Sequence, residues 1–329
     1  MKKSLLFCGV AALAFASCTQ NEVLGVNENR AIGFDAFSGK ATRAVNDITG
    51  NGGDSFTKFF VFGSYDKNGD GSGYTSVYSN DEVVYNSGWS ATETQYWVAD
   101  KNYKFAAYSD GNAALPEGTT ATFADATGKL KIAGYVVSNK DLILAEGATG
   151  NGTTKGNVTL SFSHLLSKVK FTFSTTFNAD LTVTVTNLTF SPENKGTWDN
   201  SAWSVTSGNT AAKTISSYVA KSSDPVASEE FYVLPQDNAS LKASFTVTVT
   251  DPGGAELFKK NFTDISLASG EDTNTSTTSK WVEGYAYNYN AVIKPENMDG
   301  GTTSDPIVFS PSVDVWENGT VSDNDIVNP

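Results

Sequence analysis

Apolar and polar side chains alternate with a period of two residues along much of the chain. The clearest runs are Leu181–Thr186 and Phe245–Thr250, in which every second residue is Thr. Such alternation places one set of side chains on each face of an extended strand, and β-branched residues favour that conformation. The 3.6-residue period of an amphipathic helix is nearly absent. The pattern therefore predicts an all-β protein whose strands each bury one face.

Other strand candidates are separated by clusters rich in Gly, Asn and Asp. They cover residues 58–65, 103–108, 158–162, 169–173, 181–190, 230–234, 241–250, 286–293 and 307–315. Short strands at this spacing are typical of β-sandwiches. The 329 residues allow two domains of about 100 to 200 residues each. We place the boundary near Leu166, which predicts sandwich domains at 44–166 and 167–329.

The N-terminal segment 1–17 reads as a secretion signal. It begins with two Lys residues, continues with the apolar run Leu5–Phe15, and ends in small residues before Cys18. The run is shorter than the roughly 20 residues that a membrane-spanning helix needs. The sequence before Cys18 resembles a lipobox, with Phe15 in place of the usual Leu. We expect acyl chains such as palmitate on Cys18 to anchor the chain to the outer membrane.

Arginine is confined to the N-terminal part of the chain. The sequence contains only Arg30 and Arg43, whereas its Lys residues are spread throughout. One explanation is chance in a composition that prefers Lys. The other is maturation by an Arg-specific protease, since such a pocket reads the guanidinium group and rejects Lys. The second explanation predicts cleavage after Arg43 with Ala44 as the new N-terminus, and leaves Arg30 as the alternative site.

An apolar strand precedes this predicted cleavage site. Ile32, Phe34 and Ala36 share one face of an extended segment, and the small and polar residues that follow suit an exposed loop. Cleavage would separate the strand from the body, so that 18–43 would be a propeptide. Loss of the strand would expose an apolar groove and unpaired backbone groups, which an incoming strand could satisfy.

The C-terminal tail supplies a candidate for that incoming strand. Its apolar side chains are Ile307, Phe309, Val313, Val315 and Trp316. Pro311 interrupts the segment, and because proline cannot donate in a central ladder it suggests a bend between two half-strands. We expect this tail to be the donor strand that fills the groove of a neighbouring subunit.

Composition excludes several functions. The formal net charge is -13, from 36 Asp and Glu against 23 Lys and Arg, which opposes binding to nucleic acid. Both cysteines, Cys8 and Cys18, lie at the start, and His164 is the sole histidine. The body therefore cannot form a Cys/His metal site or a thiol nucleophile. We expect no enzymatic activity, no metal and no cofactor, and we expect His164 to be a packed linker residue.

Two motifs leave alternatives open. Asp66–Gly73 has the oxygen spacing of the first half of a calcium loop, but Val77 stands where the bidentate Glu belongs. A polar turn is the favoured interpretation and weak calcium binding is the alternative. Tyr285, Tyr287 and Tyr289 share one strand face, as a sugar-stacking platform would, although such a ladder is more often packed in a core.

Short motifs distributed along the chain carry a family resemblance. They are Phe34 with Thr42–Ala44, Tyr96–Trp97, Tyr103–Tyr108, Asp141–Ala145, Phe162–Val169, Val233–Gln236, Trp281–Tyr287 and Val313–Trp316. Their order and spacing resemble those of the fimbrillins, the lipoprotein pilin subunits of type V pili in Bacteroidales.

This resemblance implies two tandem transthyretin-like β-sandwich domains after a lipoprotein signal peptide. It also implies a structural pilin that is carried to the outer membrane, cut, and polymerised by strand exchange into adhesive surface fimbriae. The expected partners are other pilin subunits, an Arg-specific protease and a host glycan or protein receptor. A glycan-binding surface lipoprotein is the alternative, and shaft, tip and anchor roles stay open.

Overall fold

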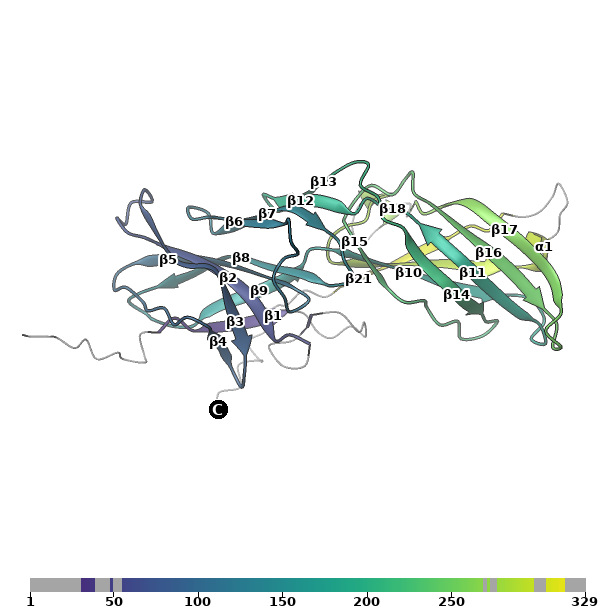
Figure 1. Cartoon of the computed structure of the whole chain (residues 1–329), viewed down its shortest axis with the longest axis horizontal. Helices are drawn as coiled ribbons and strands as arrows, with labels where there is room; N and C mark the ends of the chain where they lie inside the picture. The colour runs from purple at the N-terminus through teal and green to yellow at the C-terminus, as the bar shows by residue number, and fades with distance from the viewer. Residues whose placement is uncertain are drawn as a thin grey trace, which may run out of the picture.

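The fold consists almost entirely of β-strands in an elongated molecule (Figure 1). The computed structural model describes residues 31–38, 48–49, 55–268, 271–272, 277–298 and 306–316. Within these residues there are 21 strands and one short helix, α1 (Pro295–Met298). The prediction of an all-β fold is confirmed. None of the helical structure in the described ranges is long and apolar enough to cross a membrane.

The strands of the first half of the chain form one large sheet and half of a smaller one. They are β1 (Phe34–Ser38), β2 (Lys58–Asp66), β3 (Tyr74–Tyr85), β4 (Trp89–Ala91), β5 (Asn102–Asp110), β6 (Thr120–Ala124), β7 (Lys129–Val136), β8 (Leu142–Asn151) and β9 (Val158–His164). Seven of them make a sheet in the order β1-β9-β8-β5-β2-β3-β4. Its central strands β2 and β5 are buried on both faces, so they read as continuous apolar runs.

The two faces of this sheet enclose different cores. Phe59 and Val61 of β2 point into a cluster formed by the strands of the same sheet, whose first and last strands, β1 and β4, contact each other. Phe60 and Phe62 point the other way, into a cluster that also contains Ile132 of β7. The period of two along β2 thus supplies both cores from one strand.

The second half of the chain provides the remaining strands. They are β10 (Ser167–Thr175), β11 (Thr182–Phe190), β12 (Lys195–Asp199), β13 (Ala202–Val205), β14 (Lys213–Ala220), β15 (Phe231–Val233), β16 (Lys242–Thr250), β17 (Glu256–Ser266), β18 (Glu271–Asp272), β19 (Thr277–Thr278), β20 (Tyr285–Ile293) and β21 (Ser310–Val315). Two four-stranded sheets, β15-β10-β20-β21 and β14-β11-β16-β17, surround the third core.

The Thr-alternating runs lie in β11 and β16, where they pair with each other. Val183 lies opposite Val249 and Val185 opposite Val247, and all four side chains are buried. The intervening Thr residues lie on the other face, which is partly exposed. The alternation therefore marks the inner face of this sheet, as the sequence predicts.

One hairpin crosses the predicted domain boundary. The strands β12 and β13 follow residue 166 in sequence, yet they complete a sheet of order β13-β12-β7-β6 with strands of the first half, and Trp198 lies opposite Ile132. Figure 1 shows this hairpin beside β7. The division into 44–166 and 167–329 stays a prediction, and the hairpin ties the two segments together.

Candidate functional site

The strand β1 is an edge strand that fills a core. It pairs in parallel with β9 from Phe34 opposite Val158 to Ser38 opposite Phe162, and among the described residues no other strand lies on its outer side in the sheet order. Before the strand begins, the amide of Ile32 donates to the carbonyl of Gln95 at 2.8 Å. The side chains of β1 alternate between buried and half-buried positions.

The inward residues of β1 are the ones that the sequence predicts to share a face. Ile32, Phe34 and Ala36 are all at most 5% exposed, and they belong to the core cluster that contains Phe59 and Val61 of β2. The ring of Phe34 lies 5.5 Å from Tyr78 and 5.9 Å from Phe59 between centroids. Burying such a side chain stabilises the fold by about 1.5–3 kcal/mol, so removal of β1 would leave an apolar groove.

The tail strand β21 is the edge of its own sheet. Of the strands that the structure describes, it pairs only with β20, in antiparallel register from Tyr285 opposite Val315 to Asn290 opposite Ser310. The predicted bend at Pro311 is wrong, because Pro311 lies inside this ladder opposite Tyr289. An edge strand tolerates proline, since its missing N–H group can face away from the neighbouring strand.

The predicted donor residues divide into two groups. Ile307, Phe309 and Trp316 are buried, whereas Val313 is half-buried and Val315 is 55% exposed. The ring of Phe309 lies 5.5 Å from that of Phe171 between centroids, within the third core. The tail is thus held by buried side chains at its two ends and by edge hydrogen bonds between them.

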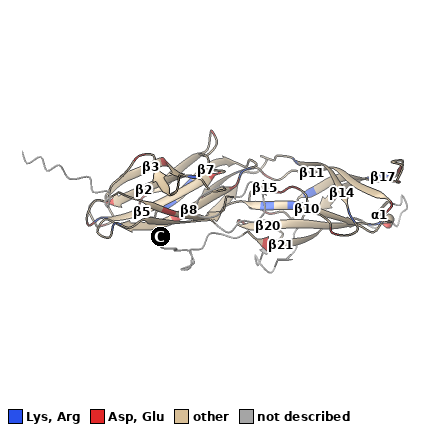
Figure 2. Ribbon diagram, turned by 90° about the horizontal axis from the view of Figure 1, so that it is seen from below, with Lys and Arg blue, Asp and Glu red and all other residues tan. Residues whose placement is uncertain are grey.

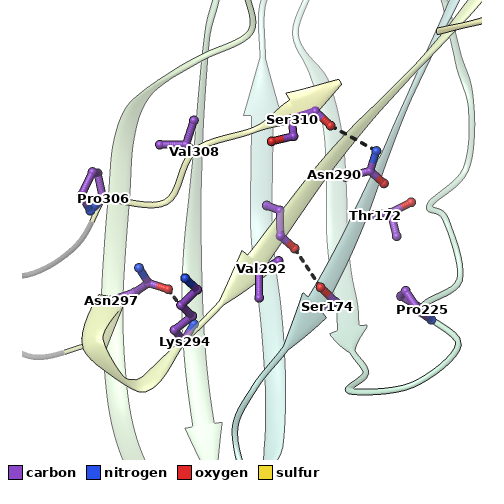
Figure 3. Close-up of a pocket in the computed structure, with 11 residues that line it drawn as sticks. Thr172, Ser174, Pro225, Asn290, Val292, Lys294, Asn297, Pro306, Val308 and Ser310 are labelled. Atoms are coloured by element: carbon purple, nitrogen blue, oxygen red, sulfur yellow. Dashed lines mark hydrogen bonds between the residues drawn. The ribbon is translucent and has the colours of Figure 1, made fainter. Parts of the chain in front are cut away.

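A pocket opens where the tail separates from β20 (Figure 3). Its volume is about 410 Å³, and its lining includes Val292 on one side and Val308 on the other. At its end the side chain of Asn290 donates to the carbonyl of Ser310 at 3.1 Å, which marks the start of the regular ladder. Lys294 is the one charged residue among the described residues that line the pocket.

Trp316 packs the end of the tail against the junction between the two halves of the chain. Its ring stacks on His164 at 3.8 Å between centroids, and the ammonium group of Lys168 lies 4.4 Å from the ring centre. Lys168 also contacts the carboxylate of Glu230 at 3.1 Å. The strand β10, which carries Lys168, runs through the middle of the molecule in Figure 2.

His164 is a packed residue, as the sequence predicts. It is 1% exposed, and its Nδ1 atom lies 3.0 Å from a carboxylate oxygen of Asp141, which is itself fully buried. The sequence does not predict this pair, because two residues 23 positions apart give no local signal of spatial contact.

The loop at Asp66 forms a turn that its own side chains close. The carboxylate of Asp66 accepts hydrogen bonds from the amides of Asn68, Gly69 and Gly71, and Asp70 accepts from Ser72. These bonds match the polar-turn interpretation. Among the described residues there is no group of three or more His, Cys, Asp or Glu side chains placed to hold a metal ion.

The tyrosine ladder is part of a core and not a sugar platform. Tyr287 and Tyr289 are fully buried, while Tyr285 is half-buried. The hydroxyl of Tyr289 donates to the carbonyl of Leu267 at 2.6 Å and accepts from the indole of Trp281 at 2.9 Å. Burial raises the pKa of Tyr289 above its usual range. The core-packing interpretation is confirmed.

A buried carboxyl group of β5 has no sequence signal at all. Asp110 is 2% exposed and accepts a hydrogen bond from the hydroxyl of Tyr135 at 3.1 Å. Burial raises the pKa of Asp110 to about 6, against the smaller opposing effects of Tyr135 and Lys140. Because the group is buried in a packed sheet, its raised pKa links the stability of the fold to pH.

Several predicted residues lie outside the described residues. These are the lipidation site Cys18, the cleavage pair Arg43 and Ala44, and the alternative site Arg30. The structure does describe Ser38 and Ile48, the buried residues on either side of the predicted cleavage site.

The described residues form packed β-sheets around three apolar cores, with the edge strands β1 and β21 near the two ends of the described chain. The fimbrillin-like family matches residues 42–316, and the chain belongs to this family. Membership supports the role of a fimbrial subunit at the cell surface. No curated protein matches the sequence.

One solved structure supports this fold. A fimbrial protein from Bacteroides vulgatus is 18% identical, with a TM-score of 0.59 over 87% of this chain and 99% of that chain. The fimbrial anchor protein Mfa2 from Porphyromonas gingivalis is 12% identical, with a TM-score of 0.35 over 88% of this chain and 100% of that chain. The likeness to the Bacteroides vulgatus protein concerns the fold alone.

Proposed function

We propose that the chain is a pilin that polymerises by protease-triggered strand exchange into adhesive surface fimbriae. The observation that carries the proposal is the position of β1. It is an edge strand whose inward side chains complete a core, and it is followed in sequence by Arg43. An edge strand of this kind can be removed without breaking the rest of its sheet, and its loss would leave a groove that favours strand addition.

The tail is the proposed donor. It carries alternating apolar residues on an edge strand, so it can leave its own sheet without disrupting the other ladders. Inserted into the groove of the next subunit, it would restore both the apolar contacts and the backbone hydrogen bonds that β1 provided. Each buried backbone group left unpaired costs about 1–3 kcal/mol, which drives the exchange.

The proposed polymerisation is tested with the purified precursor and an Arg-specific protease. The wild-type chain should give heat-sensitive ladders on unheated gels after cleavage, with Ala44 as the N-terminus. Arg43→Lys keeps the charge but removes the guanidinium that the protease reads, so it should stay monomeric. Arg30→Lys is the matched control and should polymerise. Ladders from Arg43→Lys, or none from the wild type, would contradict the proposal.

The proposed route to the surface begins with a lipid on Cys18 and passes through the outer membrane. Cys18→Ala should abolish labelling by a fatty-acid probe and should move the precursor out of the membrane fraction, because no acyl chain would then hold it. Cys8→Ala, within the same signal segment, is the control and should keep both properties. Continued labelling of Cys18→Ala would contradict the lipid-anchor proposal but would leave the strand-exchange proposal unaffected.

The proposed fimbriae would adhere to a host glycan or protein. The tyrosine ladder, which was the candidate sugar platform, is buried. No observation therefore favours the alternative of a glycan-binding lipoprotein.

A further inference from the structure

A chain of buried hydrogen bonds starts at the end of β1. The hydroxyl of Ser38 donates to the carbonyl of Ile48 at 2.7 Å. The amide of Ile48 in turn donates to the Oδ2 atom of Asp141 at 2.9 Å. All three residues are at most 3% exposed. Because Arg43 lies between Ser38 and Ile48 in sequence, residues on both sides of the predicted cleavage site meet near one carboxylate.

The same carboxylate leads to the C-terminal tail. Its oxygens lie 3.0 Å and 3.2 Å from the Nδ1 atom of His164. The imidazole of His164 stacks on the indole of Trp316 with an interplanar angle of 15°. Trp316 follows β21 directly, and its amide donates to the carbonyl of Gly284 at 2.7 Å. Asp141 and His164 thus connect the strand that would leave to the strand that would be donated.

The hydrogen-bond network from Ser38 to His164 is buried, so the loss of one of its hydrogen bonds affects the others. If Ser38 leaves with β1, the carbonyl of Ile48 loses its donor, and a buried acceptor without a partner is costly. Movement of Ile48 toward water would withdraw its amide from Asp141. The carboxylate that orients the ring of His164 would then be less firmly held, and hydrogen bonds in such a network support one another. The stack on Trp316 would weaken in consequence.

We propose that Asp141 and His164 are positioning residues that couple the two terminal strands, so that loss of β1 loosens Trp316 and β21. This inference rests on the proposed function for its biological meaning. In the uncut chain the coupling keeps the tail docked, and after cleavage it favours release of the tail for donation. The coupling is reciprocal, so loss of the tail should also loosen β1.

Hydrogen–deuterium exchange on the full, uncut chain tests the coupling without any protease. In Ser38→Ala, exchange of the peptide covering 310–316 should become about fivefold faster, the equilibrium effect of one lost buried hydrogen bond. Ser109→Ala is the matched control, because Ser109 is also buried and donates to a main-chain carbonyl, that of Lys58, at 2.6 Å. The control should leave 310–316 unchanged. The strand β16 serves as the internal reference.

A second variant shows whether the effect runs through the pair. His164→Phe keeps an aromatic ring for Trp316 but removes the contact with Asp141. Exchange at 310–316 should already be fast in this variant, and adding Ser38→Ala should accelerate it no further. If His164→Phe fails to fold, Asp141→Asn replaces it. The inference is overturned if Ser38→Ala leaves 310–316 unchanged, if it accelerates β16 equally, or if the two substitutions add independently.

Failure of the inference is distinguishable from failure of the proposed function. If cleaved wild-type chains polymerise but Ser38→Ala leaves exchange at 310–316 unchanged, the pilin proposal stands and the coupling is contradicted. If Ser38→Ala speeds exchange at 310–316 but cleaved wild-type chains do not polymerise, the coupling stands and strand exchange is contradicted.

Discussion

At the scale of single residues, burial decides what each side chain does. His164 and the tyrosines of β20 would be candidates for chemistry on an exposed surface, but each is packed against aromatic or polar neighbours. Phe34 owes its importance to the same cause, since its ring touches the aromatic core from an edge strand. These buried side chains therefore stabilise the fold instead of taking part in chemistry at the surface.

Asp110 gives a prediction about pH. Its pKa is raised to about 6 in the fold, against about 3.9 in the unfolded chain. Between these values the folded state holds the proton and the unfolded state has lost it, so the free energy of unfolding falls as pH rises. The loss should be complete above about pH 6 and amount to roughly 2–3 kcal/mol.

Urea unfolding of wild-type protein and of Asp110→Asn at pH 4 and pH 7 measures this contribution. Asparagine keeps the acceptor for Tyr135 but does not titrate, so the variant should lose stability less steeply across this interval. Asp35→Asn is the control, because Asp35 lies on the outer side of β1 and bonds to Asn157. An Asp110→Asn curve that runs parallel to the wild-type curve would show that Asp110 does not titrate there.

At the scale of elements, local pattern is informative where a strand has one buried face. The alternation in β11 and β16 and the apolar triplet of β1 could be read directly, because these strands face a core on one side only. The strand β17 was not predicted, since its first four residues are exposed and no described strand pairs with its outer edge. An exposed edge strand has no need of alternation.

The hairpin β12–β13 and the contact between Asp141 and His164 were also missed, for a different reason. Lys195–Asp199 has few apolar residues, and its stability comes from pairing with β7, a partner that local sequence does not reveal. The tail is predicted as an extended segment over 307–315 with a bend at Pro311, whereas the ladder runs without a break over Ser310–Val315 and does not include 307–309. Ile307 and Phe309 are held by the core instead of by a neighbouring strand.

The tail strand allows a direct test of its proposed release. Asn288 and Ser312 lie opposite each other in β20 and β21, and directly opposed antiparallel residues have the Cα separation that a disulfide needs. Asn288→Cys with Ser312→Cys should lock the tail, since the body has no other cysteine. The oxidised chain should be cut but stay monomeric, and reduction should restore polymerisation. Each single cysteine variant is a control and should polymerise under both conditions. Polymerisation of the oxidised double variant would show that the subunits assemble without release of β21.

At the scale of the whole molecule, the two halves are joined by more than their linker. The core that contains Phe60 of β2 also contains Trp198 of β12 and Trp316 after β21. The indole of Trp203 donates to the carbonyl of Leu165 at 2.7 Å, directly at the predicted boundary. The two halves are therefore joined by a shared sheet and a shared core as well as by the linker.

This construction predicts that the two halves unfold together. Calorimetry of the uncut chain should show one transition, because unfolding either half would expose the shared core and break the pairing of β12 with β7. Trp203→Phe removes the hydrogen bond to Leu165 while keeping a ring, and it should split the transition or broaden it on the low-temperature side. Trp281→Phe, in the core of the C-terminal sheets, is the matched control and should lower the transition temperature without splitting it. Two transitions in the wild-type chain would mean that the hairpin does not couple the unfolding of the two halves. Strand exchange in one half would then leave the melting temperature of the other half unchanged.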